Sequence, residues 1–337
     1  MKIRWCVIGA GGIADRRTIP ALLTDPNNEL VAIMDKVESV AKSIGEKYSV
    51  KYYTDEEAMI KENECDCVYI STPVAFHYDQ AMLALKYGRN VFIEKPIAFD
   101  SKQGQKLLNA FKAKGKQLSV GYMMKYHNLN VKAKEIIAND GVGQVSNVRL
   151  QFTCWYPDIP GAWRQNKKMG GGGAFMDLGV HCIELAEFIL DDDIIDVKGF
   201  ADTRTFNYEV EDRAIAVFKT KKGVIGEIDV NFNVPDKASE SKLEVYGTKG
   251  YIIAKGTLAQ EEVGELSYLY SPQGDYSAQQ NRSYDKPELF EGEKGNLYLK
   301  QIQEFCSVIQ SGKLNYKNAE RAIQVQKTVD KFYKICK

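Results

Sequence analysis

Six short β-rich segments alternate with helical patterns over about the first 120 residues, and few folds accommodate such an alternation. Between the β-rich segments, apolar residues recur at spacings of three and four, which indicates helices. Strands separated by helices form a parallel, doubly wound sheet. Pro20 lies inside the first expected helix, where we predict a break or kink. The predicted strands are Ile3 to Ile8, Leu30 to Met34, Lys51 to Tyr53, Cys67 to Ile70, Asn90 to Ile93 and Leu118 to Gly121, and the clearest helices are Glu38 to Lys47, His77 to Lys86 and Ser101 to Lys114.

The pattern changes at about Val145, where longer β-rich segments follow one another with turn signals between them. Such a series predicts a mainly antiparallel sheet. The polar segment Ser271 to Glu293 is predicted to be a long surface loop. The strands expected here include Val145 to Trp155, Ala214 to Lys219, Val224 to Phe232 and Lys242 to Tyr246, and the helices expected after the loop are Leu297 to Gln310 and Ala319 to Ile335.

The glycine-rich segment Gly9-Ala10-Gly11-Gly12-Ile13-Ala14 directly follows the first strand. It fits the dinucleotide-binding pattern Gly-x-Gly-x-x-Gly/Ala, in which the first glycine allows the tight turn and the second lets the backbone approach a pyrophosphate. Glycine-rich turns also occur without any ligand, so the surrounding pattern matters. The strand, turn and helix in this order predict a Rossmann domain.

Asp35 ends the second predicted strand, 21 positions beyond Ala14. This is close to the spacing of about 20 at which an acidic residue binds the ribose hydroxyls. A carboxylate there favours NAD and repels the 2′-phosphate of NADP. The adjacent Lys36 leaves NADP open, although a surface lysine is the simpler interpretation.

A chain of 337 residues exceeds the usual size of one hydrophobic core. We predict an α/β protein with a Rossmann domain over residues 1–122 and an α+β domain with an open, mainly antiparallel sheet over residues 123–337. The C-terminal helices could pack back on the first domain. The uncovered sheet face favours a homodimer or homotetramer.

Charge balance, hydropathy and cysteine spacing bear on the partners and the cellular compartment of the protein. The 45 basic and 45 acidic residues balance, which disfavours nucleic acid and anionic membranes. The apolar run Trp5 to Ile8 is far shorter than the roughly 20 residues of a membrane helix, and no signal-peptide pattern follows, so we expect a cytoplasmic protein. Seven scattered cysteines without a Cys-x-x-Cys pair predict reduced thiols and no metal site.

Glu94-Lys95-Pro96 ends the fifth strand, and the carboxyl ends of such strands line the ligand crevice. A partly desolvated lysine beside a cationic nicotinamide could exchange a proton with an alcohol, whereas most lysines are simply solvated. Pro96 restricts the backbone of Lys95 and could form a cis peptide bond. His77 lies at the same edge, where lining the crevice and starting a helix are equally plausible roles.

Four glycines, Gly170 to Gly173, precede a predicted helix that carries Asp177 and His181 on one face. Glycines in such a run form a flexible turn that allows close approach of the backbone. Histidine is the side chain best suited to accept a proton near neutral pH. Alternatively, Asp177 complements the helix dipole and His181 is a core histidine.

These motifs together resemble the glucose-fructose oxidoreductase, inositol dehydrogenase and rhizopine catabolism (Gfo/Idh/MocA) family over essentially the whole chain. The resemblance implies that Lys95 contacts both the nicotinamide side and the reacting hydroxyl, that Asp177 binds and orients substrate, and that His181 is the general acid/base. The motifs that carry it are Gly9 to Ala14, Ser71-Thr72-Pro73 with His77, Glu94-Lys95-Pro96, Gly121-Tyr122-Met123, Trp163-Arg164, and the glycine run followed by Asp177-Leu178-Gly179-Val180-His181.

The resemblance also implies a hydride transfer between nicotinamide and a hydroxyl or keto carbon of a sugar, cyclitol or derivative. Two positions depart from the family pattern: Lys125 stands where sugar-acting relatives often carry arginine, and Glu184 where many carry aspartate. Tyr156, with Trp155, is a candidate for stacking on a sugar, although core packing explains these aromatics equally well. The predicted cofactor-binding residues are Gly9, Gly11, Gly12, Ile13, Asp35, Thr72, Pro73, His77, Glu94, Lys95, Trp163 and Arg164, and the predicted substrate-binding residues are Lys125, Tyr156 and Asp177.

Two other functions remain open. Some members of the family keep the fold as non-catalytic nicotinamide sensors, although Lys95, Asp177 and His181 together favour chemistry. A tightly bound, recycled cofactor would instead give net transfer between two sugars, or an elimination. The sequence indicates neither the substrate nor the direction of the reaction.

Overall fold

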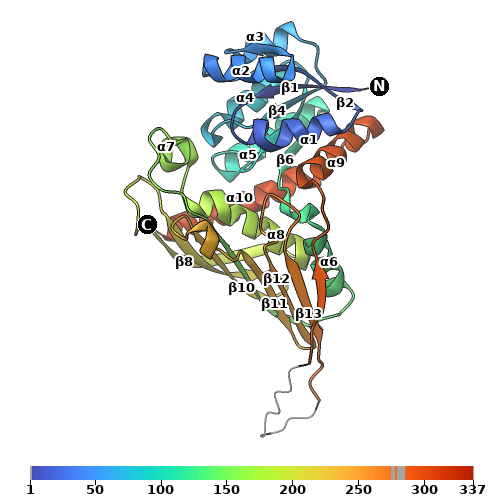
Figure 1. The fold of residues 1–337 in the computed structure, drawn as a ribbon, viewed down its shortest axis with the longest axis vertical. Helices are drawn as coiled ribbons and strands as arrows, with labels where there is room; N and C mark the ends of the chain where they lie inside the picture. Colours follow the sequence, from blue (N-terminus) through green and yellow to red (C-terminus); the bar gives the residue numbers. More distant parts are fainter. Residues whose placement is uncertain (1, 275–277, 279–284, 337) are drawn as a thin grey trace. The chain divides into compact units, whose positions relative to one another are not determined.

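The computed structural model describes residues 2–274, 278 and 285–336 (Figure 1). The chain divides into two compact units. Unit 1 comprises Met1–Tyr122, Lys168–Gly171 and Tyr298–Lys327. Unit 2 comprises Met123–Lys167, Gly172–Leu297 and Thr328–Lys337. Nearly all of helix α9 (Leu297–Ser311) and the first part of α10 (Lys317–Ile335) therefore belong to the same unit as the N-terminal residues.

Unit 1 contains a parallel six-stranded sheet in the order β3-β2-β1-β4-β5-β6, which confirms the predicted doubly wound arrangement. All four residues of β4 are buried, so both faces of the sheet centre are covered, as the apolar sequence of this strand requires. The strands are β1 (Ile3–Ile8), β2 (Asn28–Met34), β3 (Lys51–Tyr53), β4 (Cys67–Ile70), β5 (Asn90–Glu94) and β6 (Leu118–Gly121).

Near Pro20, where we predicted a break or kink, the helix changes from the π type to the α type. The segment after the glycine turn is π-helical, and the α-helix begins at Ile19 with Pro20 in its first turn, where a missing N–H costs least. Later in the chain, α9 adds to the same core, because the Phe305 ring lies 5.4 Å from the rings of both Trp5 and Phe92. The helical segments between the strands are η1 (Ala14–Thr18), α1 (Ile19–Thr24), α2 (Glu38–Tyr48), α3 (Glu56–Glu62), α4 (Val74–Lys86) and α5 (Ser101–Lys114).

Unit 2 contains an eight-stranded sheet in the order β14-β13-β12-β11-β7-β10-β9-β8. Among its described strands every neighbouring pair is antiparallel except β7 with β10, which confirms a mainly antiparallel sheet. The strands are β7 (Val145–Thr153), β8 (Ile194–Asp202), β9 (Arg213–Thr220), β10 (Ile225–Asn231), β11 (Lys242–Gly247), β12 (Gly250–Lys255), β13 (Glu265–Tyr270) and β14 (Glu288–Glu291).

The prediction that Ser271 to Glu293 is entirely a loop is wrong at its end. Glu288–Glu291 forms strand β14, which pairs with β13 from Glu265↔Glu291 to Tyr268↔Glu288. This edge strand has four residues, of which Leu289 and Phe290 stand between two glutamates, and so short a segment gives no alternating pattern. Residues 275–277 and 279–284 of the predicted loop lie outside the described residues.

One face of this sheet carries helices and the other does not (Figure 1). Helix α8 (Val180–Leu190) is almost entirely buried, and α6 (Asn128–Ala138) packs beside it. On the other face Phe200 is 88% exposed, and its neighbours in the ladder, Ile215 and Val217, are also exposed. The remaining short helical segments are η2 (Met124–Tyr126), η3 (Trp163–Gln165), α7 (Lys167–Gly170), η4 (Phe175–Gly179) and η5 (Asp236–Ala238).

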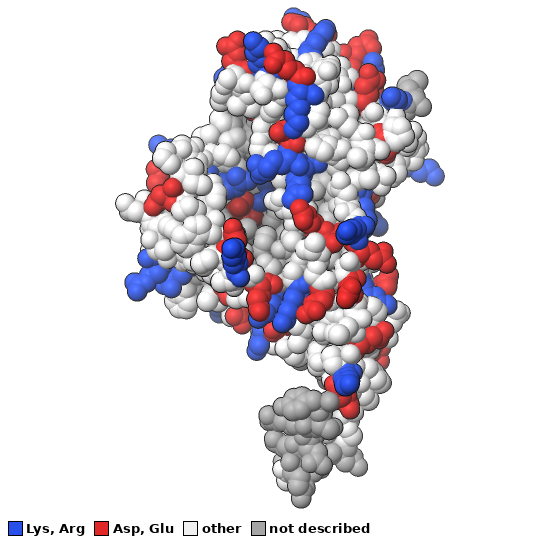
Figure 2. Space-filling model, viewed as in Figure 1, with Lys and Arg blue, Asp and Glu red and all other residues white. Residues whose placement is uncertain are grey.

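Acidic and basic side chains are interspersed over the face that Figure 2 shows, in keeping with the zero net charge. In the part of the chain that the structure describes, no helix has the length and apolar character needed to span a bilayer.

Candidate functional site

The glycine turn lies against the end of β4. Gly9 has a φ of +82°, and a Cβ on it would lie 2.8 Å from Thr72 Cγ2 and 2.9 Å from Thr72 N. Only glycine allows this backbone conformation and this approach without strain. The Ser71 hydroxyl donates a hydrogen bond of 2.7 Å to the Gly9 carbonyl. The structure therefore brings Gly9 and Thr72, two predicted cofactor-binding residues, into contact.

Asp35 follows β2 and holds the turn through its carboxylate. Its Oδ2 accepts a hydrogen bond of 3.1 Å from the Gly11 N–H, and its Oδ1 accepts one of 3.0 Å from the Val37 N–H. Each carboxylate oxygen can accept a second hydrogen bond. Asp35 therefore lies beside the glycine turn, and its binding of a ribose hydroxyl stays a prediction.

His77 is buried in the first turn of α4, directly after Pro73. Its Nδ1 lies 2.8 Å from the Pro96 carbonyl oxygen and its Nε2 lies 2.9 Å from the Thr72 carbonyl oxygen. Burial, together with the nearby positive charge of Lys95, outweighs the effect of the two carbonyls and lowers the pKa of His77 to about 4. Both ring nitrogens face backbone carbonyls, and the neutral ring donates to one of them, so any effect of His77 on a cofactor would be indirect.

Glu94 and Lys95 end β5 and are half-buried, and the Lys95-Pro96 peptide bond is cis, as considered from the sequence. Tyr69 of β4 donates a hydrogen bond of 2.7 Å to Glu94 Oε1. The Tyr69 oxygen also lies 2.9 Å from Thr18 Oγ1. Sequence reasoning missed Tyr69 because it lies inside the buried strand β4, and it missed Thr18 because only the folded chain brings this residue to Tyr69.

In unit 2 three predicted site residues form one polar cluster. Arg164 Nε lies 3.2 Å from Asp177 Oδ1, and the Arg164 side chain also hydrogen-bonds Tyr156. Burial works against the charge of Arg164, but Asp177 and Tyr156 outweigh it and raise the pKa of the guanidinium. The guanidinium carbon lies 4.3 Å from the centroid of the Trp163 ring. Tyr156, Trp163, Arg164 and Asp177 are therefore brought together.

The segment after the glycine run differs from the predicted single α-helix. Phe175–Gly179 is π-helical, and the α-helix begins only at Val180, so the spacing of an α-helix does not describe the pair Asp177 and His181. Single π-helical turns occur frequently at functional sites. His181 is buried, and its ring makes an edge contact with Phe152 at 6.2 Å.

The other histidines are held by the backbone. His127 is fully buried, with Nε2 2.9 Å from the Val263 carbonyl oxygen and Nδ1 accepting from the Leu129 N–H at 3.2 Å. Both nitrogens of His77 face backbone carbonyls. His181 differs from both in its position, because it follows Asp177 of the polar cluster by four residues.

Lys125, in η2, is half-buried with its Nζ 5.0 Å from the centroid of the Tyr126 ring. Lys125, Asp177 and His181 belong to unit 2 and Lys95 belongs to unit 1. The convergence of Lys95 and His181 on one substrate therefore stays a prediction.

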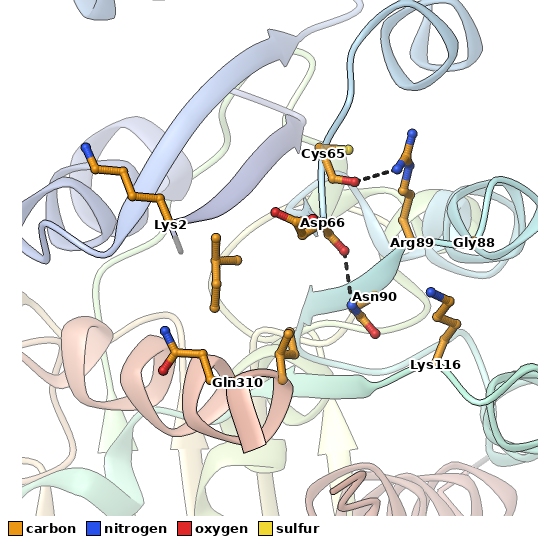
Figure 3. A pocket seen from close by; sticks show the side chains of 10 residues that line it. Lys2, Cys65, Asp66, Gly88, Arg89, Asn90, Lys116 and Gln310 are labelled. Atoms are coloured by element: carbon orange, nitrogen blue, oxygen red, sulfur yellow. Dashed lines mark hydrogen bonds between the residues drawn. The ribbon is translucent and has the colours of Figure 1, made fainter. Parts of the chain in front are cut away.

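A cavity of about 320 Å³ lies at the opposite edge of the Rossmann sheet, where β1, β4 and β5 begin (Figure 3). Some of its polar groups bind other protein groups. Arg89 Nη1 donates to the Cys65 carbonyl at 2.6 Å, and Asp66 accepts from the backbone and side chain of Arg4. Because the ligand crevice of such a sheet lies at the carboxyl ends of its strands, this cavity is not the dinucleotide site.

All seven cysteines are free thiols. Among residues 2–274, 278 and 285–336, no three or more His, Cys, Asp or Glu side chains are grouped so that they could hold a metal ion.

The fold and the glycine turn define a Rossmann-type, dinucleotide-binding protein with a second α+β domain. Residues 3–122 match the model of the oxidoreductase family with an NAD-binding Rossmann fold, and residues 130–253 match the GFO/IDH/MocA C-terminal domain. The chain belongs to this GFO/IDH/MocA oxidoreductase family, as the ordered motifs implied.

Characterised relatives are distant. A 1,5-anhydro-D-fructose reductase from Ensifer adhaerens is 27% identical over 78% of this chain and 79% of its own length. A dTDP-3,4-didehydro-2,6-dideoxy-alpha-D-glucose 3-reductase from Actinomadura kijaniata is 24% identical over 97% of this chain and 94% of its own.

Solved structures agree in fold. The aldose-aldose oxidoreductase from Caulobacter crescentus has a TM-score of 0.86 at 20% identity and covers 99% of this chain and 97% of its own. A 3-ketoreductase from Actinomadura kijaniata, in complex with NADP and TDP-benzene, has a TM-score of 0.87 at 22% identity over 100% and 98% of the two chains.

Proposed function

We propose that this protein is a cytoplasmic NAD(P)-dependent dehydrogenase or reductase that acts on a hydroxyl or keto carbon of a sugar, a cyclitol or a sugar derivative. The cluster of Asp177, Arg164 and Tyr156 carries the proposal. A carboxylate, a guanidinium and a phenol side by side offer both donors and acceptors, which is what several sugar hydroxyls require. The relatives named above as reductases of sugar derivatives support this substrate class.

When bound, the nicotinamide supplies the hydride acceptor or donor. In the oxidation direction, His181 takes the proton of the reacting hydroxyl while the carbon loses its hydride. Lys95 contacts the same hydroxyl, and its positive charge favours the alkoxide character that develops there. Asp177 binds and orients the substrate, and Tyr156 and Lys125 contact its remaining groups. The reverse direction uses the same groups, with His181 as the acid.

The residues at the carboxyl edge of the sheet suit a dinucleotide. Asp35 favours NAD through the ribose hydroxyls, and Lys36 leaves NADP as the second choice; related folds have been solved with NADP and with NAD. The proposed cofactor contacts are Gly9, Gly11, Gly12, Ile13, Asp35, Thr72, Pro73, Glu94, Lys95, Trp163 and Arg164, with His77 supporting the Thr72 and Pro96 turns.

A panel assay tests the proposal. The protein is incubated with NAD or NADP and sugars, inositols or nucleotide-sugars, and with NADH or NADPH and keto-sugars, while absorbance of the reduced cofactor is followed. Turnover of at least one member is the expected result. Tight cofactor binding without any turnover would favour a nicotinamide sensor instead. Nucleotide in the absorbance spectrum of the purified protein would favour a recycled cofactor.

We also propose a homodimer or homotetramer that forms through the open face of the eight-stranded sheet. Phe200, Ile215, Val217 and Ile225 expose apolar side chains there, on adjacent strands. Light scattering on the intact protein and on Phe200→Glu tests this, with a smaller species expected for the variant. An unchanged mass would place the interface elsewhere.

A further inference from the structure

The helical segment that carries Asp177 and His181 begins without a cap from its own sequence. The first four N–H groups of a helix have no partner within the helix. Here the first backbone bond of this kind runs from the Asp177 N–H to the Gly173 carbonyl, at 2.9 Å. The N–H groups of residues 173 to 176 therefore need acceptors from elsewhere.

Two distant residues supply all four acceptors. Glu211 accepts from the Gly173 N–H through Oε2 at 2.9 Å and from the Phe175 N–H through Oε1 at 3.0 Å. Its backbone carbonyl accepts from the Ala174 N–H at 3.0 Å. The hydroxyl of Tyr333, in α10, accepts from the Met176 N–H at 3.1 Å and donates to Glu211 Oε1 at 2.6 Å. We refer to Glu211 and Tyr333 as the anchor pair.

The glycine run is shaped for the anchor pair. A Cβ on Gly172 would lie 2.1 Å from the Tyr333 hydroxyl oxygen, and one on Gly173 would lie 1.9 Å from the Glu211 carbonyl oxygen. No side chain fits at either position. These two glycines are therefore explained by the close approach of protein groups and require no ligand.

Aromatic packing joins the same elements. The Phe175 ring stacks on Phe332 with centroids 3.7 Å apart and meets the edge of Tyr333 at 6.1 Å. A negatively charged carboxylate at the start of a helix also interacts favourably with the helix dipole. Burial raises the pKa of Glu211, while the hydrogen bonds from Tyr333, Gly173 and Phe175 oppose that rise.

We propose that Glu211 and Tyr333 are positioning residues that fix the start of the Phe175–Gly179 segment and thereby the directions of Asp177 and His181. The inference rests on the proposed function, in which these two side chains bind substrate and transfer the proton. A misplacement of about 1 Å in such groups can cost about 10² in rate. Loss of the anchor pair should therefore lower kcat and leave cofactor binding by the Rossmann unit unchanged.

Glu211→Gln and Tyr333→Phe are the test variants. In Glu211→Gln an amide NH₂ must face one of the N–H groups of residues 173 and 175. In Tyr333→Phe the Met176 N–H loses its acceptor. Tyr268→Phe is the matched control, because its hydroxyl donates to the Gly141 carbonyl at 2.9 Å within the same unit. Asp192→Asn controls for general loss of helix support, since Asp192 accepts from the Lys222 N–H just after the far end of α8.

Hydrogen exchange provides a readout independent of activity. We expect amide exchange in residues 173–177 to be about tenfold faster or more in both test variants and unchanged in the controls. With a substrate from the panel, kcat should fall by about 10- to 100-fold while the KM for NADH stays near wild type. In the His181→Ala background, Glu211→Gln should lower kcat by less than it does in the wild type, because only its effect through Asp177 remains.

Unchanged exchange in both test variants would overturn the anchor, whatever the activity. Faster exchange with kcat within about twofold of wild type would overturn the positioning role. If the wild-type protein turns over no panel member, the proposed function fails, and the exchange result still decides whether the anchor pair fixes this segment.

Discussion

The Tyr69 hydroxyl joins Glu94 to Thr18 at the carboxyl edge of the Rossmann sheet. It donates to Glu94 Oε1 at 2.7 Å, so the contact of 2.9 Å with Thr18 is a hydrogen bond donated by the threonine. Burial and the nearby Glu94 carboxylate raise the pKa of Tyr69 well above its ordinary value, which keeps the hydroxyl protonated and able to donate. The segment after the glycine turn is thereby tied to the residue that precedes Lys95.

Tyr69→Phe should weaken NADH binding by about tenfold, because the loss of a buried hydrogen bond to a charged group costs about 1.5–3 kcal/mol and only part of this falls on the ligand contacts. Fluorescence titration with NADH measures the change. Tyr87→Phe is the control, since its hydroxyl also donates at 2.7 Å to a glutamate, Glu57, at the far end of α4. Equal NADH affinities for wild type and Tyr69→Phe would assign Tyr69 a purely structural role.

Lys95→Ala and His181→Ala should each lower turnover by about 10² to 10⁴, the usual effect of losing an acid/base group. NADH affinity should stay near wild type. Initial rates with a panel substrate, together with NADH titrations, measure both quantities. Lys102→Ala, which removes an exposed lysine of α5, controls for the loss of one positive charge. Full activity in both site variants would refute the assigned roles.

Asp35→Ala should weaken NAD binding, because the ribose hydroxyls lose an acceptor and the glycine turn loses its hydrogen bond from Gly11 to Asp35. Asp35→Asn removes the negative charge while its amide oxygen can still accept from the Gly11 N–H, at the loss of the bond from the Val37 N–H. We expect its preference to move toward NADP. Titrations of both variants with NADH and NADPH measure this. Unchanged NAD affinity in both would place the ribose contact at another residue.

His77 should make stability depend on acid pH. Its pKa is about 4 in the folded protein, below the value of about 6.5 expected when unfolded, so the unfolded chain binds the proton first. The contribution of His77 is therefore present above about pH 6.5 and is lost as the pH falls to about 4. Between these values wild type should lose up to about 3 kcal/mol more than His77→Gln. Urea unfolding of both proteins across this range measures the difference, and parallel losses would contradict it.

The strands of the Rossmann sheet could be predicted almost to the residue because they are short, apolar and bounded by turns. The same reasoning placed Asp35 beside the glycine turn. It failed where the cause is distant in sequence. The π-helical turn at Phe175–Gly179 is hydrogen-bonded at its start by Glu211 and Tyr333, which lie far along the chain and carry no local signal. β14 was missed because it has four residues without an alternating pattern and needs β13 as its partner.

Tyr156, Arg164 and Asp177 show an intermediate case. Their residue types and order indicated a site, but the hydrogen bonds that join them come from the loop after β7 and from the segment before α8. Such contacts follow from tertiary packing, which no spacing rule describes. Tyr69 is a similar case. The one sequence signal for a role of Tyr69 is a phenol inside a short, fully buried strand.

The close approach of Glu211 and Tyr333 to Gly172 and Gly173 has a practical consequence for altering substrate preference. A library that randomises the glycine run would consist mostly of misfolded members, since even alanine collides at these two positions. Diversity is better introduced at Lys125, a half-buried residue that is not held by such a close approach of the backbone. Substitutions at Gly172 and Gly173 would therefore disturb the closest contacts of the glycine run and would not adjust a flexible hinge.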